Sequence, residues 1–158
     1  MKKLLVVIMA VVALSACQES KREYLSWHGL SLSLKASQFA DSLIKRGFTI
    51  DTTQSTPLLS VYTSPKEHFV LALNHENDSI TDVLEQYHAS YNDSTANLWQ
   101  TMHDQFEKEL EVWPDMRHRV ELHKEAVYET PKGTIVLTLL NTYTPTLTVR
   151  YSNSIIDK

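Results

Sequence analysis

Histidine is the residue type here with the most evident chemical potential: the chain has seven, and an imidazole can bind a metal ion or transfer a proton near neutral pH. His103 and Glu107 are four residues apart, so on a helix they share one flank and could touch a cation. That spacing is far more often a solvated pair on a helix surface. His118 and His123 are five apart and, on a strand, point to opposite faces. These spacings predict neither a metal site nor a cofactor.

Motifs for nucleophilic catalysis and phosphate binding are missing from the sequence. There is no Gly-x-Ser-x-Gly elbow, and no Ser-x-x-Lys motif in a convincing context. The three glycines, Gly29, Gly47 and Gly133, are isolated, whereas loops that cradle phosphates need glycines close together. The sequence therefore favours a non-catalytic binding module over an enzyme. A small hydrolase or metal-dependent enzyme of the cell envelope, or a carrier of an apolar ligand, is the alternative.

Large amphipathic aromatic side chains are abundant, with three tryptophans and seven tyrosines. If several tyrosines share a sheet face that no helix covers, they would form a rigid binding face, since tyrosine offers contact area at low entropic cost. The alternative is that these rings belong to the core, with their hydroxyls reaching water at its rim. The candidates, on predicted strands or their ends, are Tyr62, Tyr87, Tyr128, Tyr143 and Tyr151.

The N-terminus has the pattern of a secretory signal. A basic start, Met1–Lys3, precedes an uninterrupted apolar run over Leu4–Leu14, which is too short to be a permanent membrane-spanning helix. We therefore expect residues 1–16 to be a cleaved signal peptide. The segment Leu14–Cys17 resembles the bacterial lipobox, in which the cysteine thiol is acylated and the chain is cut before it. An ordinary signal peptide or an apolar core helix is the alternative.

Acylation of Cys17 would hold the mature protein to a membrane, because two or three acyl chains exceed what stable anchoring needs. Cys17 is the one cysteine of the sequence, so its acylation excludes thiol catalysis, cysteine-ligated zinc and disulfides. The residue after the cysteine is Gln18 and not aspartate. By the enterobacterial sorting rule for lipoproteins, this is compatible with transport to the outer membrane. We expect the protein to be lipid-anchored in the bacterial cell envelope, facing either the periplasm or the cell exterior.

The charge balance limits the partners. The formal net charge is −4 and becomes −6 once Lys2 and Lys3 are removed with the signal peptide. An acidic body disfavours nucleic acid and anionic lipid surfaces as partners. The lipid would then be the sole anchor to the membrane. Because the chain is expected to be anchored and has no catalytic constellation, we expect its partners to be the membrane, through the N-terminal lipid, and an envelope protein.

Two segments have helical spacing of their apolar residues. The first begins at Ser33 as N-cap and ends at Gly47, in the position of a left-handed C-cap. The second runs from about Ser94 to Val112, and Pro114 stops it. Their apolar faces are Ala36, Phe39, Ala40, Leu43 and Ile44 in the first, and Leu98, Trp99, Met102, Phe106 and Leu110 in the second.

Strand-like runs follow each helix, bounded by turn residues such as Pro57 and Pro131. Ser79–His88 fits either a helix face or a strand. The other runs are Phe48–Thr53, Leu58–Thr63 and His68–Leu73 after the first helix, and Val120–Glu129, Thr134–Leu140 and Leu147–Tyr151 after the second.

The order of these elements predicts the organisation of the chain. Residues 17–26 would be the lipidated cysteine and a polar tether, and residues 27–158 a single α+β globular domain. Because helix-then-strands occurs twice, we expect two helix-plus-antiparallel-sheet units in tandem, in halves of about 27–91 and 92–158. Both helices would pack on one face of the sheet.

Several segments besides the lipobox resemble a known group of proteins. Trp27–Leu30, Ile44–Phe48, Gly133–Leu137 and Val149–Tyr151 are similar to segments of small Bacteroidetes lipoproteins with a β-lactamase-inhibitor-protein-like domain, of which the SmpA/OmlA lipoproteins have a half-size version. The resemblance implies a tandem helix–sheet scaffold that binds proteins or envelope components and has no chemistry of its own. It also favours a strand for Ser79–His88. It transfers no functional residue.

Overall fold

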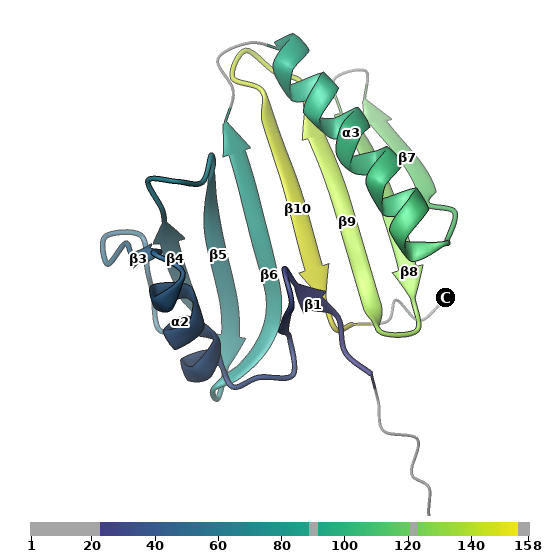
Figure 1. Ribbon diagram of the computed structural model, residues 1–158. Helices are drawn as coiled ribbons and strands as arrows, with labels where there is room; N and C mark the ends of the chain where they lie inside the picture. The colour runs from purple at the N-terminus through teal and green to yellow at the C-terminus, as the bar shows by residue number, and fades with distance from the viewer. Residues whose placement is uncertain (1–22, 89–91, 121–122, 155–158) are drawn as a thin grey trace, which may run out of the picture.

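One large antiparallel sheet dominates the computed structural model, which describes residues 23–88, 92–120 and 123–154 (Figure 1). Its eight strands are all joined by antiparallel pairing. In spatial order they are β3 (Thr49–Ile50), β4 (Leu59–Thr63), β5 (Phe69–Glu76), β6 (Ser79–His88), β10 (Thr146–Ser152), β9 (Gly133–Leu140), β8 (His123–Thr130) and β7 (Asp115–Val120).

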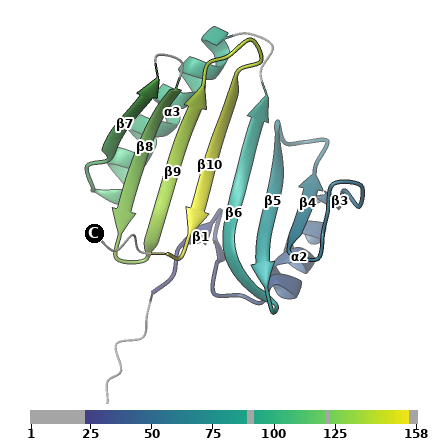
Figure 2. The ribbon, with the colours of Figure 1, turned by 180° about the vertical axis from the view of Figure 1, so that it is seen from behind.

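The last strand of the described chain lies at the centre of this sheet. β10 pairs with β6 on one side and with its sequence neighbour β9 on the other. The β6–β10 register places Tyr87 opposite Leu147 and Val83 opposite Tyr151. The sheet therefore continues without a break from the strands that precede the second helix to those that follow it (Figure 2).

Both helices cover the same face of the sheet, in front of it in Figure 1 and behind it in Figure 2. α2 (Ala36–Lys45) buries Ala36, Phe39 and Leu43, which the three- and four-residue spacing places on one side of the helix. α3 (Asn92–Leu110) packs against β8, β9 and β10. No helix among the described residues has the length and apolar character needed to cross a bilayer.

The expected α+β fold with two tandem helix-plus-antiparallel-sheet units is wrong. The described chain is mostly β, with one eight-stranded sheet, a separate two-stranded sheet and two helices. The predicted boundary falls next to β6, yet β6 is hydrogen-bonded along both of its edges. Strand pairing depends on backbone groups that are distant in sequence, and local composition does not encode it. Composition also did not indicate β7, and it predicted a longer strand, Phe48–Thr53, where β3 is only Thr49–Ile50.

The two-stranded sheet is a short hairpin on the helix side of the large sheet, in front of the lower parts of β6 and β10 in Figure 1. It consists of β1 (Ser26–Trp27) and β2 (Leu30–Ser31). Its turn residues, His28 and Gly29, have φ values of 42° and 80°, as a type I′ hairpin turn requires. Trp27 is 2% exposed, so the hairpin contributes to the main core.

The turn between β5 and β6 also holds the start of α2. Asn77 and Asp78 both have positive φ, which again fits a type I′ turn. The Ser37 amide donates to Asp78 Oδ1 at 2.9 Å, and the Ala36 amide donates to the Asp78 carbonyl at 2.8 Å. Asp78 thus satisfies amides that a helix start leaves unpaired.

One local prediction is confirmed, one open alternative is decided and one prediction is wrong. Gly47 has a φ of 92°, the left-handed value expected after a helix. Ser79–His88, which fitted either a helix or a strand, is a strand. The N-cap of α2 is Lys35, whereas Ser33 was expected there. The Ser33 amide and hydroxyl instead contact the hydroxyl of Ser31.

Candidate functional site

The predicted tyrosine face is not an exposed surface. Tyr62, Tyr128 and Tyr151 are 2%, 0% and 8% exposed, and Tyr87 is half-buried. The four rings do share one sheet face, but it is the face that carries the helices, so they pack in or against the core. Burial raises the pKa of all four hydroxyls. Tyr143 is separate and fully exposed in the β9–β10 loop.

A buried carboxylate lies at the centre of the helix side. Glu85 occupies an inward position of β6, between Val83 and Tyr87, and is 1% exposed. Its Oε1 accepts a hydrogen bond from Trp27 Nε1 at 2.6 Å and lies 3.0 Å from His28 Nε2. Its Oε2 accepts the Tyr87 hydroxyl at 3.0 Å. These contacts compensate the cost of burying a carboxylate and fasten the β1–β2 hairpin to the sheet.

His28 is the titratable partner in this cluster. Its side chain is 59% exposed, so it reaches solvent while its Nε2 faces Glu85. The hydrogen bond to Glu85 raises the pKa of His28, and burial partly opposes this effect. Glu67 raises the same pKa by charge attraction and Arg46 lowers it by repulsion. When protonated, His28 forms an ion pair with a carboxylate that the core holds in place.

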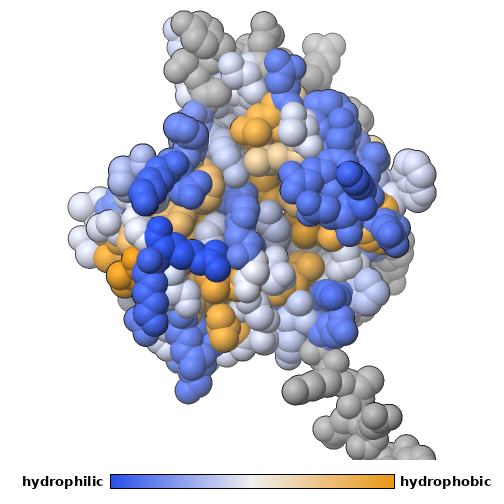
Figure 3. Space-filling model, viewed as in Figure 1, coloured by the Kyte–Doolittle hydropathy of each residue, from blue (hydrophilic) through white to orange (hydrophobic). Residues whose placement is uncertain are grey.

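Two clefts flank His28. A cleft of about 510 Å³, which we call the α3 cleft, separates the hairpin from the last turns of α3, and Phe106, Ile135 and Tyr151 are among its lining residues. A second cleft of about 320 Å³, the aromatic cleft, is lined by Trp27, His28, Arg46, Phe48, Glu67 and Phe69. Figure 3 shows hydrophobic side chains on this side of the molecule, bordered by hydrophilic ones.

The aromatic cleft has a wall of three rings in mutual contact. The ring centroids of Trp27, Phe48 and Phe69 lie 6.1 to 6.4 Å apart in each pairing, distances typical of favourable aromatic pairs. The guanidinium of Arg46 lies 5.9 Å from the Trp27 ring centroid and donates from Nη1 to the His28 carbonyl at 3.1 Å. These contacts hold a cation at one side of an apolar wall.

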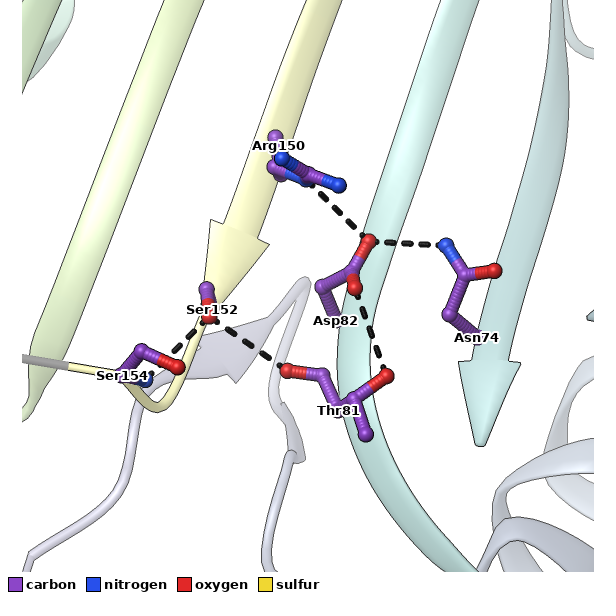
Figure 4. Close-up of polar contacts among 6 residues, drawn as sticks. All are labelled: Asn74, Thr81, Asp82, Arg150, Ser152 and Ser154. Carbon is purple, nitrogen blue, oxygen red and sulfur yellow. Dashed lines mark hydrogen bonds and ion pairs between the residues drawn. The ribbon is translucent and has the colours of Figure 1, made fainter. Parts of the chain in front are cut away.

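The opposite face of the sheet carries no helix (Figure 2). Asp82 accepts hydrogen bonds there from Asn74 Nδ2 at 2.8 Å and from Arg150 Nε at 3.3 Å (Figure 4). The strand register aligns Arg150 with Leu84 on one side and with Val136 on the other. Leu84 and Val136 are partly exposed, so an apolar strip crosses this face at the level of Arg150. The next level along the same strands is polar, with Gln86, Thr148 and Thr138 in register.

The sequence-predicted pair His103 and Glu107 does lie together. His103 Nε2 is 3.5 Å from Glu107 Oε1, and an oxygen of Asp104 lies within 4.8 Å of both ligand atoms. The other ring nitrogen of His103, Nδ1, is hydrogen-bonded to the Tyr128 hydroxyl, and its ring stacks on Trp99. The arrangement orients His103 within the α3–sheet packing, and the exposed Asp104 is held by Gln100.

Glu85 is the residue of this site that the sequence reading missed. The available signal was its position, because Val83, Glu85 and Tyr87 alternate with outward residues along one strand. A charged residue at an inward position requires partners. Those partners, Trp27 and His28, lie 58 and 57 positions away in the sequence, so no local pattern identifies them.

Cys17, the predicted lipidation site, lies outside the described residues. Comparisons of the chain with models of known protein families, with curated proteins and with solved structures give no match.

Proposed function

We propose that this chain is a lipid-anchored, non-catalytic binding module of the bacterial cell envelope. Cys17 would carry the acyl chains that hold the protein to a membrane. Because Gln18 follows the cysteine, we expect this membrane to be the outer membrane. The helix-free face of the sheet would hold a partner protein. The lipobox supports the first part of the proposal, and the composition of the helix-free face supports the second.

The observation that carries the binding role is an apolar row across the middle of the helix-free face. The registers align Ala72, Leu84, Arg150, Val136 and Val127 on five neighbouring strands. Ala72, Leu84 and Val136 are partly exposed, whereas Val127 is buried. Protein interfaces combine an apolar centre with a polar rim, and arginine is enriched among their strongest contacts. Strands paired on both edges are rigid, so little ordering would accompany binding.

Charged pairs lie within this row and at one end of it. Arg150 of the row pairs with Asp82 of β6, and Arg117 of β7 lies 2.9 Å from Asp115 and 3.9 Å from Glu125. Exposed pairs of this kind add little stability. At an interface they would contribute selectivity, because a partner must match both signs of charge.

Site-specific photo-crosslinking in the host tests the binding role. A photoreactive residue at Leu84 or Val136 should give one adduct of defined mass, and Arg150→Glu should reduce its yield. The control position is Ile44, which is 56% exposed on α2, on the other side of the molecule. Equal adducts from Ile44, or no adduct from the helix-free face, would contradict the proposal.

Cell fractionation tests the anchor independently. We expect Cys17→Ser to leave the membrane fraction, or to keep its signal peptide and run at a higher mass than the wild-type protein. Palmitate labelling should disappear in this variant. A Cys17→Ser protein with wild-type mass and wild-type membrane association would refute lipid anchoring.

The catalytic alternative has one feature in its favour, the pairing of His28 with a buried carboxylate. Such a pair can orient a histidine as a general base. In the described part of the chain, however, no serine or threonine hydroxyl is hydrogen-bonded to His28. The pair therefore supports a structural role for His28 better than a catalytic one.

A further inference from the structure

Two opposite charges line the aromatic cleft without neutralising one another. Arg46 follows α2, and Glu67 belongs to the β4–β5 loop; both line the cleft together with His28. Among the ion pairs of the described residues, none joins Arg46 to Glu67. Both side chains border the same cleft of about 320 Å³.

The remaining boundary of the cleft is apolar and rigid. Trp27 and Phe48 are only 2% and 5% exposed, so they back the cleft, and the partly exposed Phe69 presents ring surface to it. Trp27 is fixed by its hydrogen bond to Glu85. Arg46 uses Nη1 for the His28 carbonyl. A guanidinium has five N–H donors, so Arg46 keeps donors for a ligand while that bond fixes its position.

We propose that the aromatic cleft binds a small zwitterion with an apolar side chain, namely an amino acid or a short peptide. The ligand carboxylate pairs with Arg46, its ammonium pairs with Glu67, and its side chain packs on the accessible part of the Phe69 ring. Arginine suits this role because its planar fork matches a carboxylate. The cleft, at about 320 Å³, is at the small end of the range for ligand sites. This inference is independent of the protein-binding face, which lies on the other side of the sheet.

Calorimetric titration of the full chain in detergent tests the charge requirement. The probes are L-phenylalanine and L-phenylalanyl-L-phenylalanine. The matched controls are phenylalanine amide, which lacks the carboxylate, N-acetylphenylalanine, which lacks the ammonium, and glycine, which lacks the side chain. We expect saturable binding of at least one of the two probes, and about tenfold weaker binding or more for each control, since each leaves one group of the cleft unpaired.

Variants assign the charges to residues. Arg46→Gln and Glu67→Gln should each weaken the binding of the zwitterion about tenfold, and Arg46→Gln should have little effect on phenylalanine amide, which has no carboxylate to lose. Lys45→Gln and Glu76→Gln are the controls, because neither residue lines the cleft. All four positions are exposed, and circular dichroism verifies that the variants fold.

Several outcomes would overturn the proposal. It fails if neither probe binds at millimolar concentration, if phenylalanine amide and N-acetylphenylalanine bind as well as the zwitterion, or if the control variants weaken binding as much as Arg46→Gln. These results would leave crosslinking from Leu84 and Val136 unaffected, so the two proposals can fail separately.

Discussion

The indole Nε1 of Trp27 donates a 2.6 Å hydrogen bond to Glu85 across 58 positions of sequence. This bond joins the first strand of the described chain to the middle of the large sheet. It also explains how a carboxylate that is 1% exposed is tolerated in the core, since charge-assisted hydrogen bonds are among the strongest in proteins.

Glu85→Gln should lower the free energy of unfolding by about 1–3 kcal/mol, because it removes the charge that three donors surround. Chemical denaturation of the full chain measures the change. Glu76→Gln, at an exposed end of β5, is the control and should alter the stability by less than about 0.5 kcal/mol. An unchanged midpoint for Glu85→Gln would mean that the cluster contributes no net stability.

Stability should depend on the protonation of His28. Because its pKa is raised in the folded state, mainly by Glu85, its contribution is fully present below the ordinary value of 6.5 and is lost as the pH rises through the folded pKa. Glu67 adds to this effect and Arg46 opposes it. The stability difference between wild type and His28→Asn should therefore be larger at acidic than at alkaline pH.

Asparagine is the appropriate replacement at this position because it tolerates the positive φ of His28. Denaturation at a series of pH values measures the difference, and an NMR titration of the imidazole gives the pKa itself. A stability difference that stays constant with pH, or a pKa of His28 below 6.5, would contradict the assignment.

Gly133→Ala should be far more damaging than Gly47→Ala. A Cβ at Gly133 would lie 2.2 Å from the Ser152 carbonyl oxygen, and its φ is 146°. A Cβ at Gly47 would meet nothing within 4 Å, so its cost is the left-handed backbone alone, about 1 kcal/mol. We expect a loss of about 2–4 kcal/mol for Gly133→Ala. Thermal melting compares the two variants. Equal decreases in melting temperature would be inconsistent with the β9–β10 packing.

Asp78→Gly should lower the stability by about 1 kcal/mol, the usual value of a helix N-terminal cap. Glycine accommodates the positive φ of Asp78, so the lost contacts with Ser37 are the main change. Asn77→Gly is the matched control, because Asn77 has the same backbone character and makes no contact with Ser37. The prediction fails if the Asp78→Gly and Asn77→Gly variants have the same melting temperature.

Chelation should leave the protein unchanged. His103, Asp104 and Glu107 come within 4.8 Å of one another, but His103 Nε2 faces Glu107 and Gln100 holds the exposed Asp104, contacts typical of an ordinary helix surface. Elemental analysis of the purified full chain should find no stoichiometric metal. A melting temperature that falls with chelator and recovers with zinc would revive the metal-dependent alternative.

Local features were predictable from the sequence where one segment determines its own conformation. The spacing of Ala36, Phe39 and Leu43 defines the buried side of α2, and Gly47 ends the helix as expected. Ser79–His88 fitted two periodicities, and its pairing with β5 and β10 decides for a strand.

Features that depend on distant partners were not predictable in the same way. The tyrosines on strands were recognised, but which sheet face the helices would cover follows from packing, so Tyr62 and Tyr128 are core residues. The order of the strands and the partners of Glu85 involve residues far apart in sequence. The strand order and these distant partners therefore cannot be read from the composition of any one segment.

The central position of β10 has a consequence for how the chain is made. Residues 146–152 supply the strand that joins β6 to β9, so the ribosome must release nearly the whole described chain before the sheet can close. Until then β6 lacks a neighbour along one edge. The strands that precede α3 and those that follow it can therefore form one sheet only after residues 146–152 have left the ribosome.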